Sequence, residues 1–247
     1  MYDELVAYAD QDFVLCDKFH IHNPTLLEIK EYGEQKYWQE ISVLTATPAD
    51  EKLYLFSLGI DYNTIQDFQL FLMLCKDGAI PDTCLILPDI NFKNYICCPH
   101  EDSLALYDEK TDTIITENDY IELTDYIRQI HGLKKNESRD GNEHTKRRRL
   151  EIELERLQRK INSDIKDEYH SQLKTYISAL TNQSGFKYNW HDVWDLPINV
   201  FIDSLFRLQI IDRSKSLNQG LYSGNIDYNK IKNKEEFNWL RPIANEN

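Results

Sequence analysis

Histidine and cysteine side chains are the residues of this sequence best suited to bind a metal. His20 and His22 alternate along an expected strand, so both imidazoles lie on one face. A second group, Cys97, Cys98 and His100, adds thiols and a third imidazole. Zinc prefers such ligands, but this spacing matches no established finger or ribbon. We favour exposed histidines and thiols buried as small hydrophobic groups, and we expect no metal or other cofactor.

The sequence carries no recognisable catalytic or nucleotide-binding motif. Nucleophilic catalysis requires an activated serine or cysteine beside a histidine, and neither a nucleophile elbow nor a catalytic cysteine loop is found. The eight glycines occur singly, mostly at expected helix ends, so no glycine-rich phosphate loop is formed. We therefore expect a protein without enzymatic activity.

Charge and composition restrict the partners and the compartment. The 247 residues carry a formal net charge of −14, which disfavours nucleic acid as a partner because phosphate binding requires a basic surface. Segment 134–160 is basic, with ten Lys/Arg against six Asp/Glu and a net charge of +4. The rest of the chain therefore carries a net charge of −18. The five cysteines lack a disulfide spacing, and there is neither a signal-peptide pattern nor an apolar run of roughly 18 residues to span a bilayer. We expect an intracellular protein with no membrane partner.

Hydrophobic spacing predicts an α+β fold that is predominantly α-helical. The pattern at 13–15 and 18–22 predicts one hairpin, and 104–107 with 113–116 predicts a second. An apolar run at 84–87 predicts a short buried strand.

The expected helices carry start and stop signals that define the organisation of the chain. Asn23 followed by Pro24 is expected to cap a helix whose apolar face extends to Leu44. We expect four parts: an N-terminal α+β domain at 1–132, a polar solvated linker at 133–145, a long amphipathic helix at 146–184, and an aromatic-rich helical C-terminal region at 185–247.

The long helix carries the first candidate binding surface. Leu150, Leu154 and Leu157 recur at three- and four-residue spacing among charges of both signs, and this narrow stripe suits a coiled-coil-like contact within the chain or with a partner. The basic run 146–149 could contact nucleic acid or an acidic partner, but the glutamates of the next turns favour a solvated surface with i,i+4 ion pairs.

Aromatic residues form the second candidate surface. Tyr188, Trp190 and Trp194 lie within seven residues of one another, and Trp and Tyr dominate the energetics of protein interfaces when they are exposed. Aromatic side chains are also the largest core residues, and we favour core packing for this cluster.

The sequence resembles a family of proteins encoded among the tail genes of long-tailed phages and prophages of Gram-positive bacteria. The resemblance is carried by IHNPTLLEI at 21–29, GFKYNWHDVWDLPI at 185–198 and GLYSGNID at 220–227, and it extends from about Phe13 to Leu240. Many tail assembly chaperones are made as a short form and a frameshifted long form, whereas this chain is uninterrupted.

The resemblance implies a non-enzymatic tail assembly chaperone acting in the host cytoplasm. Such a protein binds the tape-measure protein and helps to recruit tail-tube subunits. The alternative is a minor structural component of the tail that remains in the virion, and self-association is left open. The family supplies no catalytic or ligand-binding residues.

Overall fold

The structure is a computed structural model that describes residues 5, 8–9, 12–15, 19–101, 103–138, 143–161 and 169–243. The chain is mostly helical, with 52% helix and 12% strand, and its described strands form two small antiparallel sheets. The predicted α+β class, predominantly α-helical, is confirmed.

The first sheet is the predicted N-terminal hairpin. β1 (Phe13–Leu15) pairs antiparallel with β2 (Phe19–Ile21). The residues of β2 are buried, exposed and buried in turn, which is the alternation of a strand with one face on the core. The hairpin is therefore half-buried, with the imidazole of His20 on its outer side.

Helix α2 (Leu26–Tyr32) is capped by Thr25, so the predicted Asn23 cap is wrong. The Thr25 hydroxyl accepts the backbone N–H of Glu28 at 3.2 Å, and the Glu28 carboxylate accepts the backbone N–H of Thr25 at 2.8 Å. This reciprocal pair is a capping box. Thr25 also forms an antiparallel bridge with Pro197, which keeps the chain extended up to the first turn of the helix.

A glycine divides the first predicted helix into two. Gly33 has a φ of 104°, which L side chains rarely adopt, and it separates α2 from α3 (Glu34–Leu44). Two further helices follow, α4 (Lys52–Ser57) and α5 (Asp67–Lys76).

The second sheet contains one more strand than predicted. β4 (Ser103–Asp108) and β5 (Thr113–Ile115) confirm the second hairpin, and β3 (Tyr95–His100) pairs with the other side of β4. Pro99 lacks an N–H to donate, but β3 lies at the edge of the sheet, where this is tolerated. The strand predicted at 84–87 is wrong, because that segment is buried but has no regular secondary structure. A short apolar run in the sequence does not distinguish a buried strand from a buried irregular segment.

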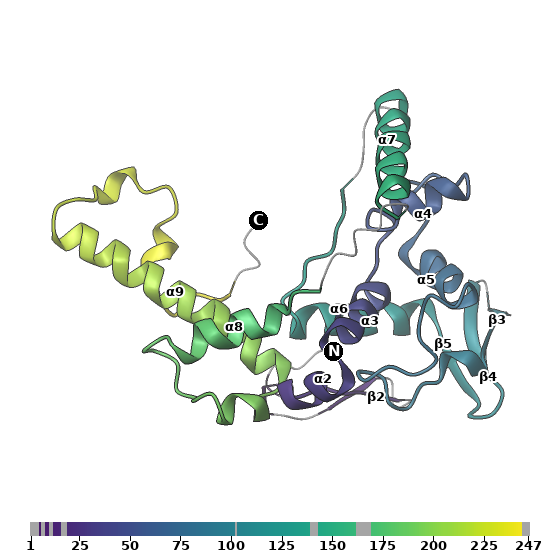
Figure 1. Ribbon diagram of the computed structural model, residues 1–247, viewed down its shortest axis with the longest axis horizontal. Coiled ribbons are helices and arrows are strands. Elements are labelled where there is room, and N and C mark those ends of the chain that lie inside the picture. Colours follow the sequence, from purple (N-terminus) through teal and green to yellow (C-terminus); the bar gives the residue numbers. More distant parts are fainter. Residues whose placement is uncertain are drawn as a thin grey trace.

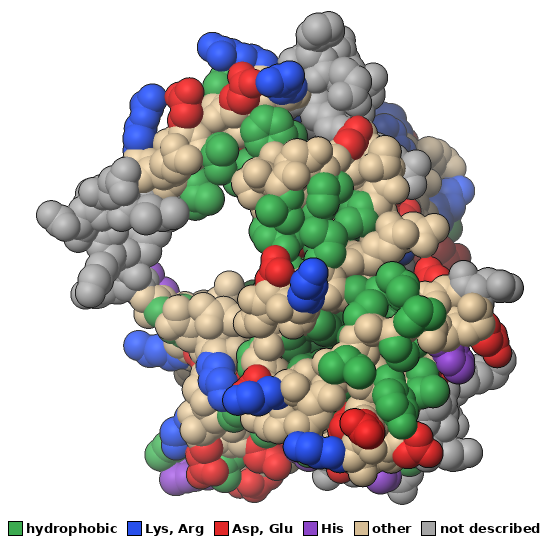
Figure 2. All heavy atoms as spheres, turned by 90° about the vertical axis from the view of Figure 1, so that its right-hand side faces the viewer, with side chains coloured by type: hydrophobic (Ala, Val, Ile, Leu, Met, Phe, Trp, Pro, Cys, Tyr) green, Lys and Arg blue, Asp and Glu red, His purple; other side chains and the backbone are tan. Residues whose placement is uncertain are grey.

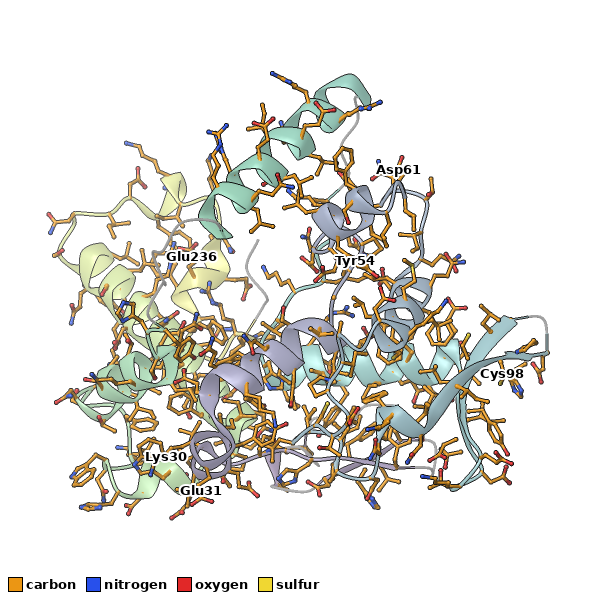
Figure 3. All side chains as sticks on the ribbon, turned by 45° about the vertical axis from the view of Figure 1, so that its right-hand side comes forward. Lys30, Glu31, Tyr54, Asp61, Cys98 and Glu236 are labelled. Atoms are coloured by element: carbon orange, nitrogen blue, oxygen red, sulfur yellow. The ribbon has the colours of Figure 1, made fainter. Side chains whose placement is uncertain are left out.

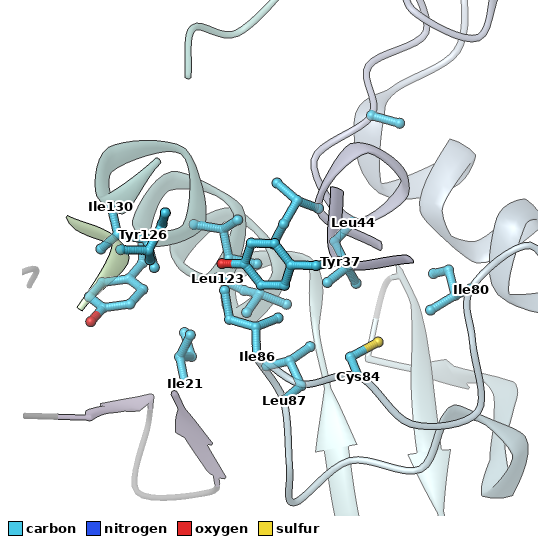
Figure 4. Packing of buried hydrophobic residues seen from close by; sticks show 14 of the residues in the cluster. Ile21, Tyr37, Leu44, Ile80, Cys84, Ile86, Leu87, Leu123, Tyr126 and Ile130 are labelled. Atoms are coloured by element: carbon cyan, nitrogen blue, oxygen red, sulfur yellow. The ribbon is translucent and has the colours of Figure 1, made fainter. Parts of the chain in front are cut away.

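The core forms around α6 (Glu117–Ile130). The largest fully buried side chains are Tyr37, Tyr120 and Tyr126, which come from α3 and α6. Figure 4 shows the ring of Tyr37 beside Leu123 of α6, with residues of the irregular buried segment below it. The core therefore combines large aromatic side chains of α3 and α6 with aliphatic residues such as Leu123.

The single helix predicted at 146–184 is divided in the structure. α7 (Glu143–Ile161) and α8 (Gln172–Thr181) are separate, and residues 169–171 between them are not helical. The Ser171 hydroxyl accepts the backbone N–H of Lys174 at 2.9 Å and caps α8. Serine is a favoured N-cap residue, so Ser171 was a signal for the start of a new helix. This signal was missed because the surrounding sequence was predicted as one long helix.

Beyond α8 the chain turns and then runs outward along the longest helix. Figure 1 shows α9 crossing from the body to one end of the molecule, β3 and β4 at the other end, and α7 at the top. The remaining elements are η1 (Phe92–Asn94), η2 (Asp192–Asp195), α9 (Ile198–Tyr222), η3 (Tyr228–Lys230) and η4 (Lys234–Phe237).

The C-terminal helices pack on the N-terminal part. One cluster of buried residues includes Leu26 and Ile29 of α2 together with Leu173 of α8 and Phe201 of α9. Gly132 closes α6 with a φ of 60° and lies so near α9 that a Cβ there would be 2.8 Å from a ring carbon of Phe206. α6 and α9 are therefore in close contact.

Residues 133–138 of the predicted linker are mostly exposed but are attached to the body. Lys135 forms an ion pair with Asp67 at 2.7 Å, and the Asn136 amide donates to Asp50 at 2.8 Å. In the part of the chain that the structure describes, no helix is both long and apolar enough to cross a membrane.

Candidate protein-interaction surfaces

One turn of α7 is attached to the body. Leu150 is buried, with 3% of its surface exposed, and α7 contacts α4. The Lys52 ammonium of α4 lies 3.1 Å from the Glu153 carboxylate of α7. The first residue of the predicted leucine stripe is therefore used inside the chain.

The rest of the stripe is less buried. Leu154 is half-buried and Leu157 is 42% exposed. Ile152 is two residues from both Leu150 and Leu154, so it lies on the other side of the helix, where it is 38% exposed. Figures 1 and 3 show α7 at the top of the molecule, apart from the central helices, and Figure 2 shows an opening beneath this region with hydrophobic side chains on its border. α7 thus presents apolar surface that the described residues do not cover completely.

The predicted aromatic cluster is divided between surface and core. Trp190 is 63% exposed, and its ring lies tilted by 35° against the exposed ring of His191, at 3.7 Å between centroids. Tyr188 is 41% exposed. Trp194 is half-buried, and the Lys30 ammonium of α2 lies 5.3 Å from its ring centroid. Core packing therefore applies to Trp194 in part and is wrong for Trp190.

A third apolar surface was not predicted. Tyr222, Trp239 and Leu240 are 88%, 53% and 68% exposed at the end of α9 and in the segment that returns from it. From the sequence, this region was placed in the aromatic-rich helical C-terminal part, and no binding role was assigned to these three residues. Its signal was the run of aromatic residues between lysines at 222–239.

The histidines considered for zinc are paired with carboxylates instead. His20 Nδ1 lies 2.9 Å from Asp89, and the two ring nitrogens of His22 lie 2.9 Å from Asp12 and 3.2 Å from Glu28. The cysteines and His100 are on the other sheet, in β3. Within the described ranges no three His, Cys, Asp or Glu side chains are placed to hold one metal ion.

A buried histidine joins α3 to α6. His131 Nδ1 lies 2.6 Å from the carbonyl oxygen of Ile127, which can only accept, so this nitrogen donates and Nε2 accepts from the Tyr37 hydroxyl at 2.5 Å. Complete burial lowers the pKa of His131 to about 4. The imidazole is therefore neutral at pH 7 and holds two helices together.

The other buried titratable groups are also held in packed surroundings. Burial raises the pKa of the Cys75 and Cys84 thiols to about 12, so neither is an activated nucleophile. Burial also raises the pKa of Glu40, whose carboxylate accepts from the Tyr32 hydroxyl. These groups connect α2, α3 and the irregular segment.

A cavity of about 380 Å³ lies between α6 and α9. Its polar side chains already have partners within the chain. The Tyr8 hydroxyl donates to Asp203 at 3.3 Å, and the Arg207 guanidinium donates to the carbonyl oxygens of Trp239 and Arg241 at 3.2 and 2.7 Å. The hydrogen bonds of Arg207 at the border of the cavity attach the C-terminal segment to α9.

The apolar surfaces described above belong to a chain with a partial match to a known family. Residues 164–244 match the family model of the YomV second domain. YomV is a protein of the Bacillus prophage SPβ. The match covers α8, α9 and the returning segment, and it relates this part of the chain to a prophage protein. No curated protein and no solved structure matches the chain.

Proposed function

We propose that this chain is a non-enzymatic assembly chaperone of a phage tail, which binds the tape-measure protein and helps to recruit tail-tube subunits. The match of residues 164–244 to a domain of a prophage protein supports a role in a phage. The sequence segments that resemble proteins encoded among tail genes support a role in tail assembly. The chain acts in the host cytoplasm, before the tail is complete.

The carrying observation is the apolar surface of α7. Leu150 attaches the helix to α4, whereas Leu157 of the same stripe is 42% exposed. An amphipathic helix with a narrow leucine stripe packs well against a second helix through side chains at a and d spacing. A long helical tape measure offers such a partner, and covering its apolar face prevents its aggregation.

The second partner is assigned to the aromatic surface. Trp190 and Tyr188 are exposed on a segment that precedes η2, away from α7. Large aromatic side chains contribute most of the binding energy in many interfaces. A tail-tube subunit bound there would be held on the same chain as a tape measure bound on α7.

Co-expression tests the proposal. The tape-measure protein of the same phage is produced alone, with this chain, and with the variant Leu157→Ser, and the soluble fraction is measured. We expect the native chain to raise the soluble fraction and the variant to lose most of that effect. Leu58→Ser, at a 51% exposed position just after α4, is the matched control. An unchanged soluble fraction with the native chain would contradict the proposal.

Mass spectrometry distinguishes a chaperone from a structural component of the tail. A chaperone is abundant in lysates of infected cells and absent from purified virions. A constant copy number in virions would instead assign the same binding surfaces to permanent neighbours in the tail.

A further inference from the structure

The far end of α9 forms a preorganised projection, which we call the distal arm and define as residues 213–241. The Arg213 guanidinium donates twice to Glu236, at 3.0 and 2.8 Å, and the Ser214 hydroxyl donates to the carbonyl oxygen of Phe237 at 2.6 Å. Ile226 packs against Gly220, where a Cβ would not fit. These contacts fold the returning segment back on α9, so the arm is ordered before it meets a partner.

The surface of the distal arm is both apolar and basic. Tyr222 is 88% exposed, Leu240 is 68% exposed and Trp239 is 53% exposed. The arm holds six Lys/Arg against three Asp/Glu, a net charge of +3 in a chain of −14, so the remainder carries −17. Exposed aromatic groups among cations are suited to an acidic protein surface with apolar residues of its own.

This chain has such a surface, which we call the acidic sheet and define as residues 95–125, comprising β3, β4, β5 and the first part of α6. The sequence there has nine Asp/Glu and one Lys/Arg, and of the nine acids Asp108 and Asp119 are buried. Ile96 pairs with Tyr107, and Tyr107 pairs with Ile114, so the three side chains form a row across the outer face. Ile96 is 60% exposed, and Leu104, near the hairpin tip, is 47% exposed.

The two surfaces lie at opposite ends of the same molecule. Figure 1 places the end of α9 and the β3–β4 hairpin at the two ends of the long axis, and Figure 3 labels Glu236 of the arm and Cys98 of the sheet on opposite sides. Figure 2 views the sheet end and shows hydrophobic side chains in patches, with carboxylates and also Lys or Arg side chains around them. Within one chain, the arm therefore does not reach the sheet.

We infer that the distal arm of one copy binds the acidic sheet of a second copy, head to tail. The contact joins two different surfaces, so it is heterologous, and each added copy leaves one arm and one sheet free. Repetition gives a ring or an open chain of copies. The inference does not depend on the tape-measure proposal, since it uses other residues.

Salt and concentration provide the first test. Attraction between a +3 arm and an acidic sheet is screened within about 8 Å at physiological ionic strength, so the association weakens as salt increases. Sedimentation velocity of the full chain at increasing protein concentration should show growing assemblies at low salt and smaller ones at high salt. A single monomer boundary at all concentrations in low salt would overturn the inference.

Two classes of variant test the surfaces themselves. Tyr222→Ser with Leu240→Ser removes the apolar part of the arm, and Ile96→Ser with Glu109→Lys alters the sheet. Each double variant should sediment as a monomer, with at least a tenfold weaker association than the native chain. Leu58→Ser is the control and should associate normally, and circular dichroism checks that every variant is folded.

Mixing the two double variants separates head-to-tail binding from other arrangements. The arm variant keeps an intact sheet, and the sheet variant keeps an intact arm, so a 1:1 mixture should form a heterodimer that cannot grow. An arm-to-arm contact predicts instead that the sheet variant associates by itself. That result, or a mixture that remains monomeric while the native chain associates, would refute the inference.

Discussion

The carboxylate of Glu34 accepts a hydrogen bond of 2.9 Å from the backbone N–H of Leu173. Glu34 lies in the first turn of α3 and Leu173 in the first turn of α8, so a side chain from one part of the chain caps a helix of another. The N-terminus of a helix carries unpaired N–H groups and partial positive charge, both of which favour a carboxylate there. This contact fixes α8 on the N-terminal part.

Removal of this cap should loosen the C-terminal helices. We expect Glu34→Ala to lower the free energy of unfolding by about 1–2 kcal/mol, the usual cost of a lost helix cap. Urea denaturation followed by circular dichroism measures the change. Glu31→Ala removes an exposed carboxylate from the preceding turn and should leave stability nearly unchanged. Equal stabilities of the two variants would show that the cap is energetically unimportant.

The same contact should make stability depend on pH. Burial alone would raise the pKa of Glu34, but the N–H of Leu173 and neighbouring donors lower it more, so the folded pKa lies below the usual value. Stabilisation is present above the unfolded pKa of about 4.3 and is lost as pH falls through the folded pKa. Below about pH 4, the native chain and Glu34→Ala should therefore become closer in stability. A difference that stays constant down to pH 2 would contradict this.

His131 should add a second pH dependence in a higher range. Burial lowers its folded pKa to about 4, whereas the unfolded imidazole titrates near 6.5. The unfolded state therefore binds more protons between these values, and stability falls as pH decreases from 6.5 towards 4, by up to about 3 kcal/mol. His131→Gln should lose the part of this slope above pH 5, where carboxylates contribute little. His191→Gln, at an exposed position, should retain it.

The sequence predicted those elements whose signals are local. The hairpins at β1–β2 and β4–β5 were predicted from the hydrophobic pattern, and α9 lies within the C-terminal region that was predicted to be helical. Gly33 divides the first helix because it adopts a positive φ. A single glycine in a helical pattern does not by itself predict that the helix ends there. Local patterns therefore predicted whether a segment is a helix or a strand more accurately than the residues at which it begins and ends.

Contacts between distant segments could not be predicted. The contact of Glu34 with Leu173 joins positions 139 residues apart, and neither residue type indicates its partner. The exposure of Trp190 was also missed, because an aromatic residue has the same sequence signal on the surface and in the core. The leucine stripe was found by its spacing, but only the structure separates the buried Leu150 from the exposed Leu157.

Gly132 should be intolerant of a side chain. An added Cβ would lie 2.8 Å from the ring of Phe206, and the φ of 60° also disfavours L residues. Gly78 has a similar φ of 70° with open space around it, so it is the matched control. We expect Gly78→Ala to cost about 1 kcal/mol for the backbone, and Gly132→Ala about 1–3 kcal/mol more for overpacking. Similar losses in thermal denaturation would mean that α9 moves away without cost.

The leucines of α7 should separate stability from binding. Leu150→Ala removes a buried side chain at the contact with α4 and should destabilise the docked helix by about 2–3 kcal/mol, measured by hydrogen exchange of α7 amides. Leu157→Ala removes a 42% exposed side chain and should change that protection by less than about 0.5 kcal/mol. If α7 binds a helical partner, Leu157→Ala should nevertheless weaken capture of the tape-measure protein. A loss of protection in Leu157→Ala equal to that in Leu150→Ala would mean that the stripe serves the chain itself, because both leucines would then be packed against the body.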